Sequence, residues 1–278
     1  MKPLAIAILL LAASFSASAQ WIRYSTPGIP RTRDGKPNLT APAPKASNGK
    51  PDLSGLWQAQ ATPLDELTRL FGPGLTTLSV PGDDLATFSK YAISVLADFK
   101  PDDAPLRPEA AQIFRRRAES LGKDNPTAQC QLGSVPFSGL LPFPSKFVQT
   151  PGVIVILHEA DGAVRQIFTD GRKHTPAPQP SWMGYSIAKW EGDVLVADTV
   201  GFNDKGWLDG FGHPRSEQLH VTERYHRRDF GHMDVQVTLD DPTMYTQPFT
   251  IKYTLDLAPD TEIAEYVCAE NEKDRSHF

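Results

Sequence analysis

The second half of the chain alternates apolar and polar residues with a period of two, the pattern of strands with one buried face. The pattern is clearest at 249–257, where Phe, Ile, Tyr, Leu and Leu alternate with Thr, Lys, Thr and Asp. Consecutive antiparallel strands of this kind predict a meander that closes into a lipocalin-like barrel or folds as a sandwich. Eight candidate strands lie at 146–159, 163–170, 184–190, 193–202, 217–227, 233–241, 249–258 and 262–269.

Residues 58–125 have a helical period instead. We expect helices over 63–72, 83–99 and 107–122; Pro108 near the start of the last one and Gly122 past its end fit the usual asymmetry of helix ends. The second half has no strand–helix–strand alternation, which argues against a Rossmann or hydrolase-type α/β fold. The sequence therefore predicts a mainly β protein with a helical N-terminal segment.

A short repeat lies in the Pro-rich leader at 20–51. The stretch "RDGKPNL" at 33–39 returns as "SNGKPDL" at 47–53, each with an Asp/Asn-Gly turn followed by Lys-Pro. We interpret the repeat as tandem turns, and the Pro-rich residues between them as extended and mobile, because proline blocks both helix and sheet. The next stretch, "GLW" at 55–57, resembles the Gly-x-Trp with which lipocalin-like barrels begin.

The first nineteen residues have the form of a secretory signal peptide. Lys2 precedes an apolar stretch that is too short to cross a bilayer, and Ala17-Ser18-Ala19 supplies the small-x-small cleavage pattern. No later segment is apolar enough to span a membrane, so we expect a periplasmic or secreted protein. In an oxidising compartment Cys130 and Cys268 are most simply a disulfide, the alternative being two free thiols.

These signals divide the chain into four parts. We expect a signal peptide at 1–19, a mobile leader at 20–51, a first strand plus helical segment at 52–130, and an antiparallel β domain at 131–278. The formal charge is −5 and the sequence has only one short arginine run, so it does not predict the basic surface that binding of nucleic acid requires. The chain also lacks the common nucleophile, phosphate-loop, dinucleotide, His-Glu-x-x-His and Cys-x-x-Cys motifs, so no cofactor is expected.

The candidate functional region is residues 201–232. Four of the seven histidines lie at 213–232, just after a loop with four glycines. On a strand across 217–227, Glu223 shares one face with apolar residues, and His220 shares the other face with Arg224. If the first face points inward, Glu223 is a carboxylate in an apolar wall and suits acid–base work, unless an arginine pairs with it. If the second face lines the cavity, the site is built on His220.

Three interpretations of this region stay open. In the first, Asp209, His213, His220 and Glu223 perform general acid–base catalysis. In the second, His213, Glu217, His220 and Asp209 hold a divalent metal, although their spacing matches no named motif. In the third, all are ordinary turn and strand-surface residues. Substrate-binding candidates around them are Asn203, Asp204, Trp207, Glu217, Arg224 and Trp182.

Several motifs resemble a large family of exported bacterial proteins with no assigned activity. The resemblance covers nearly all of the mature chain and is carried most clearly by "PSWMGYSIAKWEGDVLVADTVGFND" at 180–204 and "WLDGFGHPRSEQLHVTERYHR" at 207–227. It implies that the candidate residues at 201–224 belong to a family pattern. Some relatives have histidine where this chain has Arg215, which disfavours a histidine-rich metal site here.

Three functions follow as hypotheses. The first is an exported hydrolase or lyase that uses acid–base chemistry on a small organic or carbohydrate substrate. The second is a non-catalytic, lipocalin-like protein that binds a small hydrophobic or aromatic ligand. The third is an envelope structural or interaction protein, with the leader as its docking arm.

Overall fold

The chain folds into a closed β-barrel, so the predicted mainly β class is confirmed and the barrel alternative holds over the sandwich. The computed structural model describes residues 25–74 and 87–268. Nine strands follow one another around the barrel in chain order, and β1 closes it by pairing with both β2 and β9. The strands are β1 (Gly55–Ala59), β2 (Ser145–Thr150), β3 (Val153–His158), β4 (Val164–Phe168), β5 (Tyr185–Glu191), β6 (Val194–Val200), β7 (His220–Arg227), β8 (His232–Asp240) and β9 (Phe249–Leu257).

The pairing differs from the expected meander in three ways. First, β4 and β5 run parallel, joined by the long crossover 169–184, so the barrel is not wholly antiparallel. Second, the candidate strand 146–159 is a hairpin, because Pro151 and Gly152 turn the chain between β2 and β3. Third, 262–268 forms no strand, since β9 already pairs on both sides and leaves no edge to extend.

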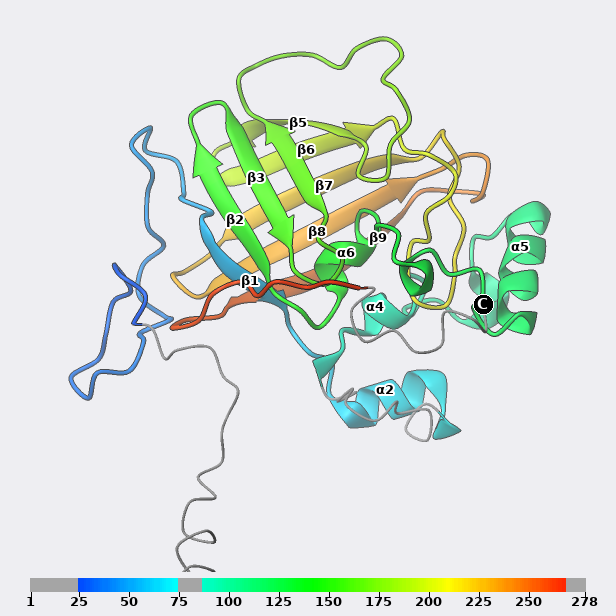
Figure 1. Cartoon of the computed structure of the whole chain (residues 1–278), viewed down its shortest axis with the longest axis horizontal. Helices are drawn as coiled ribbons and strands as arrows, with labels where there is room; N and C mark the ends of the chain where they lie inside the picture. The colour runs from blue at the N-terminus through cyan, green and yellow to red at the C-terminus, as the bar shows by residue number, and fades with distance from the viewer. Residues whose placement is uncertain (1–24, 75–86, 269–278) are drawn as a thin grey trace, which may run out of the picture.

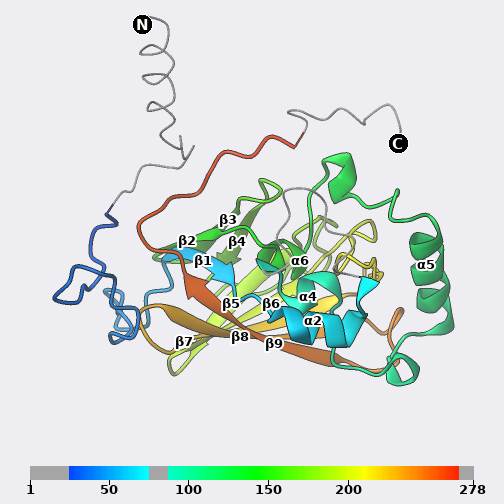
Figure 2. The same ribbon diagram turned by 90° about the horizontal axis from the view of Figure 1, so that it is seen from below.

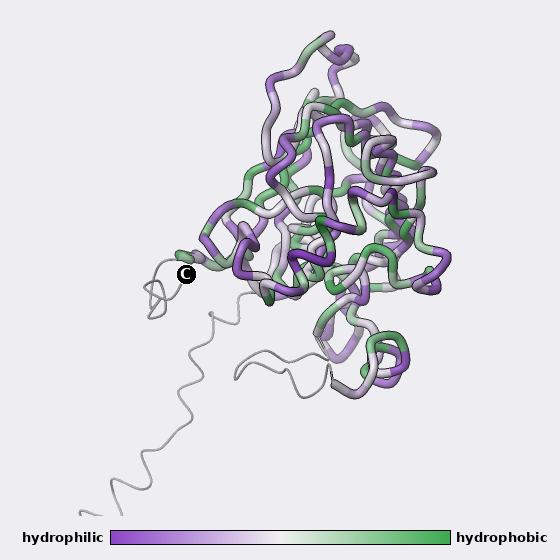
Figure 3. Tube along the Cα trace, turned by 90° about the vertical axis from the view of Figure 1, so that its right-hand side faces the viewer, coloured by the Kyte–Doolittle hydropathy of each residue, from purple (hydrophilic) through white to green (hydrophobic). Residues whose placement is uncertain are grey.

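Alternating residues of each strand fill the barrel interior. The inner face of β8 is Met233, Val235, Val237 and Leu239, all almost completely buried, whereas the residues between them are half-buried on the outside. Figure 3 shows hydrophobic and hydrophilic positions interspersed along the trace of the barrel. The apolar residues that recur with a period of two in the sequence therefore mark the buried face of each strand.

The helices gather at one end of the barrel, called here the helical end (Figures 1 and 2). They are α2 (Leu64–Phe71), α4 (Lys90–Ile93), α5 (Pro108–Glu119) and α6 (Phe137–Leu140), with short 3-10 turns at Pro101–Asp103 and Thr127–Gln129. The expected helices at 63–72 and 107–122 are confirmed as α2 and α5. Of the expected helix 83–99, the described part 87–99 is α-helical only over α4: Ser94 is extended, and the Val95 N–H donates to the Asp209 carboxylate instead of continuing the helix.

The leader lies at the opposite end, called here the leader end, beside the joined tips of β2 and β3 (Figure 1). The tandem turns are confirmed: Thr32 N–H donates to the Lys36 carbonyl at 2.9 Å, and Ala46, fourteen residues later, donates to Lys50 at 2.8 Å. The first turn docks on the barrel, because Gly231 N–H donates to the Leu39 carbonyl at 2.7 Å. Hydrogen bonds hold both turns of the leader within 25–51, and the mobility expected for the leader stays a prediction.

A tryptophan closes part of the leader end. Trp57 is fully buried, and its indole N–H donates to the Leu53 carbonyl at 2.9 Å. The Arg227 guanidinium lies 4.8 Å from the Trp57 ring centre and donates to the backbone carbonyl of Asp52. Because β1 carries this tryptophan and closes the barrel, the first strand belongs to the β domain, and the expected boundary at 131 does not separate two units.

The predicted disulfide between Cys130 and Cys268 is confirmed, with a Cα–Cα distance of 5.5 Å. It ties the chain just before α6 to the segment after β9. Within residues 25–74 and 87–268, no helix is long and apolar enough to cross a membrane. The predicted signal peptide at 1–19 lies outside the described residues.

Candidate functional site

The burial pattern of strand β7 shows which face of the predicted strand 217–227 points inward. Val221, Glu223 and Tyr225 are buried in the barrel, and Glu223 is only 2% exposed. His220 and Arg224 lie on the outer face. Of the two alternatives, it is therefore the Glu223 carboxylate, and not the His220 ring, that lies in the barrel interior.

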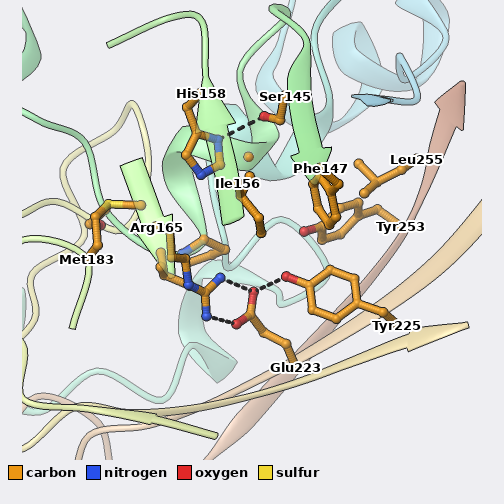
Figure 4. Close-up of a pocket in the computed structure, with 14 residues that line it drawn as sticks. Ser145, Phe147, Ile156, His158, Arg165, Met183, Glu223, Tyr225, Tyr253 and Leu255 are labelled. Atoms are coloured by element: carbon orange, nitrogen blue, oxygen red, sulfur yellow. Dashed lines mark hydrogen bonds and ion pairs between the residues drawn. The ribbon is translucent and has the colours of Figure 1, made fainter. Parts of the chain in front are cut away.

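An arginine pairs with Glu223 inside the barrel. Arg165 Nη1 donates to Glu223 Oε1 at 3.0 Å, Nη2 donates to Oε2, and the Tyr225 hydroxyl donates to Oε1 at 2.7 Å (Figure 4). Arg165 also donates to the hydroxyls of Ser186 and Thr199. Burial opposes the charge on Arg165, but the Glu223 carboxylate outweighs it and raises the pKa of the guanidinium. The charges thus satisfy each other, and Glu223 is not the isolated carboxylate that acid–base work needs.

A histidine on β3 completes this polar interior. His158 Nδ1 lies 2.8 Å from the Ser145 hydroxyl, directly across the β2–β3 pair. Burial lowers the pKa of His158 to about 4, so the ring is neutral near neutral pH. Figure 4 shows the ring above Arg165, on the side of the pocket away from Glu223.

The space between these side chains is small. The cavity holds about 20 Å³ and is covered at the helical end by Ser134, Pro136 and Gly139. That volume accommodates roughly one water molecule. The interior cluster is therefore a packed polar core, with room for a water but not for an organic substrate.

Sequence reasoning missed Arg165 and His158. The sequence did contain a signal for both. Arg165 and His158 alternate with outward-facing residues, so they share the inner face of their strands with apolar residues such as Ile156 and Ile167. A charged residue on the buried face of one strand needs an oppositely charged or hydrogen-bonding side chain on another strand. The sequence does not show which strand lies opposite Glu223 across the barrel.

Asp209 and His213 come together, but away from the interior cluster. The Asp209 carboxylate is completely buried and accepts the backbone N–H groups of Val95, Gly212 and His213 and the His213 Nδ1 contact at 2.5 Å. The His213 ring stacks on Phe114 of α5 at 4.4 Å between ring centres. The pair holds the 201–219 loop against the helices.

Arg215 organises the rest of this loop. It is 1% exposed and donates to the Trp182 carbonyl at 3.1 Å and to Asn203 Oδ1 at 2.8 Å. Burial lowers its pKa to about 9. Trp207 is also buried, whereas Asp204 and Glu217 are exposed. Arg215 therefore links the Trp182 backbone to the Asn203 side chain, whereas the Asp204 and Glu217 side chains face solvent.

His220 belongs to a third location on the outer face of the barrel. Its Nε2 contacts Asp198 of β6, and the other Asp198 oxygen contacts His174 Nε2 at 3.1 Å. Hydrogen bonding to Asp198 raises the pKa of His220. Nearby, Arg224 pairs with Glu191 at 3.0 Å. The four predicted catalytic residues thus occupy three separate places.

The metal set is not assembled either. Glu217 is exposed, while His213 is buried against α5 and His220 lies on the outer face of β7. No group of three or more His, Cys, Asp or Glu side chains in the described part of the chain is arranged to hold a metal ion.

A large cavity opens at the leader end, and we call it the mouth. It has a volume of about 630 Å³. Its barrel wall is made by inward-facing residues at the ends of β2, β3, β4 and β5, namely Gln149, Ile154, Thr169 and Trp190. Its outer wall is the second leader turn, with Ser47, Asn48 and Asp52. The mouth and the interior cluster are stacked along the barrel, since Ile154 lines one and Ile156 the other.

Gln149 fixes the leader turn to this wall. Its side-chain oxygen accepts the Leu53 N–H at 2.9 Å, and its amide nitrogen donates to the Pro51 carbonyl at 3.2 Å. Lys50 adds a contact to the carbonyl of Gly192 at 3.0 Å. The mouth therefore has two walls from distant parts of the sequence, held at a fixed spacing.

Comparison with known proteins does not assign the chain to a family. No family model matches the chain, and the searches of curated proteins and of solved structures found no match.

Proposed function

We propose that this protein is an exported binding protein that holds a small molecule in the mouth of its barrel. The observation that carries the proposal is the cavity of about 630 Å³ between the barrel wall and the second leader turn. Its size lies within the range of roughly 300–1,000 Å³ that is usual for small-molecule pockets. The interior cluster, at about 20 Å³, is far below that range.

Binding has more support than catalysis. An acid–base enzyme needs its catalytic groups within reach of one substrate. Asp209 and His213 hold a loop at the helical end, His220 lies outside the barrel, and Glu223 is paired with Arg165. The mouth contains none of these four residues.

Export rests on the predicted signal peptide and on the disulfide, a bond that persists in oxidising compartments. A lipocalin-like relationship is supported by Trp57, which follows the Gly-x-Trp pattern and plugs one side of the barrel end. Membership of the exported bacterial family stays a prediction from the motifs at 180–227.

The tandem turns supply a matched pair of variants for testing the mouth. Ser47 is exposed on the second turn and lines the mouth, whereas Arg33 is exposed at the equivalent position of the first turn. Ser47→Trp places a bulky ring in the mouth without touching the core, and Arg33→Trp places the same ring elsewhere.

Saturation-transfer NMR with methyl β-glucoside, benzamide, benzoate and octanoate tests the proposal. We expect at least one probe to bind the wild-type chain and Arg33→Trp but to lose its signal with Ser47→Trp. No signal from any probe, or equal signals with both variants, contradicts the proposal.

A further inference from the structure

We propose that the ligand of the mouth is a neutral carbohydrate. This inference rests on the proposed function and gives the ligand its chemical class. It follows from three properties of the mouth: unused hydrogen-bonding groups, the absence of cations along its wall, and one aromatic ring beside an apolar floor.

The mouth presents donors and acceptors that nothing else in the described chain engages. The hydroxyls of Ser47 and Thr169, the amide N–H₂ of Asn48 and the indole N–H of Trp190 make no hydrogen bond within residues 25–74 and 87–268. Asp52 uses one carboxylate oxygen for the Ser54 N–H and leaves the other open. A polyol has hydroxyls that both donate and accept, so it can pair with all of these groups.

The charge of the wall disfavours acidic ligands. The described residues that line the mouth include no Lys, Arg or His, and they do include Asp52. Lys50, in the second leader turn, is engaged with the Gly192 carbonyl. Arg227 lies next to Asp52 but does not line the mouth, and it donates to the backbone carbonyls of Asp52 and Phe230. Fatty acids, phosphates and aromatic acids would therefore bring a negative charge beside the Asp52 carboxylate without a cation in the mouth to pair with it.

The apolar part of the mouth suits one face of a sugar ring. Trp190 is half-buried, with part of its ring packed on the core, and Ile154 is a fully buried floor beside it. A sugar offers C–H groups on one face for stacking and hydroxyls on its rim. A purely apolar ligand would cover the same ring but would leave the Thr169, Asn48 and Asp52 groups without partners.

The test is isothermal titration of the full-length mature protein with methyl β-glucoside, N-acetylglucosamine and cellobiose, and with octanoate and benzoate as anionic comparisons. We expect at least one sugar to bind and both anions to fail. Thr169→Val, which removes one hydroxyl, should weaken sugar binding about tenfold, and the loss of the ring face in Trp190→Leu should weaken it at least as much. Thr222→Val on the outer face of β7 is the matched control and should bind like the wild-type chain.

The outcomes separate this inference from the proposed function. If benzamide or octanoate binds in a manner that Ser47→Trp abolishes, while no sugar binds, the carbohydrate assignment is overturned and the binding mouth remains. If no probe of any class binds, both are overturned. Sugar binding that is lost in Ser47→Trp, retained in Arg33→Trp and weakened in Thr169→Val supports both, even if Trp190→Leu fails to fold.

Discussion

Replacing Glu223 by Gln should destabilise the fold strongly, because it leaves the Arg165 guanidinium buried without its counter-charge. Arg165 is 4% exposed and Glu223 2% exposed, so bulk solvent cannot reach the guanidinium to compensate for the lost carboxylate charge. Breaking a buried pair in this way costs about 3–5 kcal/mol. At about 2–4 °C per kcal/mol for a domain of this size, the melting temperature should fall by roughly 6–20 °C.

The same reasoning predicts that removing the whole cluster costs little. In the triple variant Arg165→Met, Glu223→Leu, Tyr225→Phe, no charge or hydroxyl of these three residues is left unpaired. The hydroxyls of Ser186 and Thr199 still bond each other, at 3.0 Å. Replacing a buried ion pair by apolar residues is often neutral or stabilising by about 1–4 kcal/mol. Stability near or above that of the wild-type chain is therefore expected.

Urea denaturation of the wild-type chain, the single variant and the triple variant measures both effects. A loss below about 1 kcal/mol in Glu223→Gln would refute the argument that the pair is a sealed structural unit. Loss of ligand binding in a well-folded triple variant would refute the placement of the ligand in the mouth, because the cluster does not line it.

Three other changes have defined expectations. Asp198 raises the pKa of His220, so the contact between them stabilises the fold fully below a pH of about 6.5, the usual histidine pKa. This stabilisation is lost as the pH rises through the raised pKa of His220. In urea titrations, His220→Gln should therefore cost roughly 0.5 kcal/mol at about pH 5.5 and less at about pH 9. Exchanging Cys130 and Cys268 for Ser opens a crosslink with a sequence separation of 138 residues and should lower the unfolding free energy by about 2–5 kcal/mol. Gly231→Ala would place a Cβ only 2.4 Å from the leader, at the Cβ of Leu39, and should cost about 1–3 kcal/mol and speed proteolysis of the leader.

Each of these has a matched control. Thr222→Val removes no titratable group from the same outer face of β7 and should change the stability equally at acid and alkaline pH. An equal loss at both pH values in His220→Gln would refute the titration argument. The double Ser chain should be insensitive to reductant, while the wild-type chain should lose the same free energy on reduction. Gly139→Ala should be tolerated, since its nearest contact is the His158 ring at an ordinary 3.8 Å; equal behaviour of both glycine variants would contradict the docking of the leader.

The barrel was predictable because its strands carry one buried face. The period of two placed β4 to β9 within a few residues, and the Gly and Asp turns separated most of them. The parallel contact of β4 with β5 was not predictable, because it involves only Ile167 with Ser186 and Phe168 with Ile187, and no local pattern marks it. The alternation at 262–268 was misleading, since a closed barrel offers no further edge.

The candidate site was predictable only in part. Strand parity identified Glu223 as an inward carboxylate if its apolar neighbours face the core, and the arginine that could neutralise it was foreseen as a type but not as Arg165. Asp209 and His213 are near in sequence and in space, yet their partners come from Val95 and Phe114, more than ninety residues earlier. The mouth was not predictable, because it exists only where the second leader turn meets the far ends of β2 to β5.

The central claim is that the ligand lies in the mouth, between Trp190 and the second leader turn. A crystal structure of the mature protein, soaked with the probe that binds best by saturation transfer, tests it most directly. The account predicts ligand density over the Trp190 ring, in contact with Thr169 on one side and Asn48 on the other. Density beside Arg165 and Glu223 in the barrel interior, with an empty mouth, would contradict it.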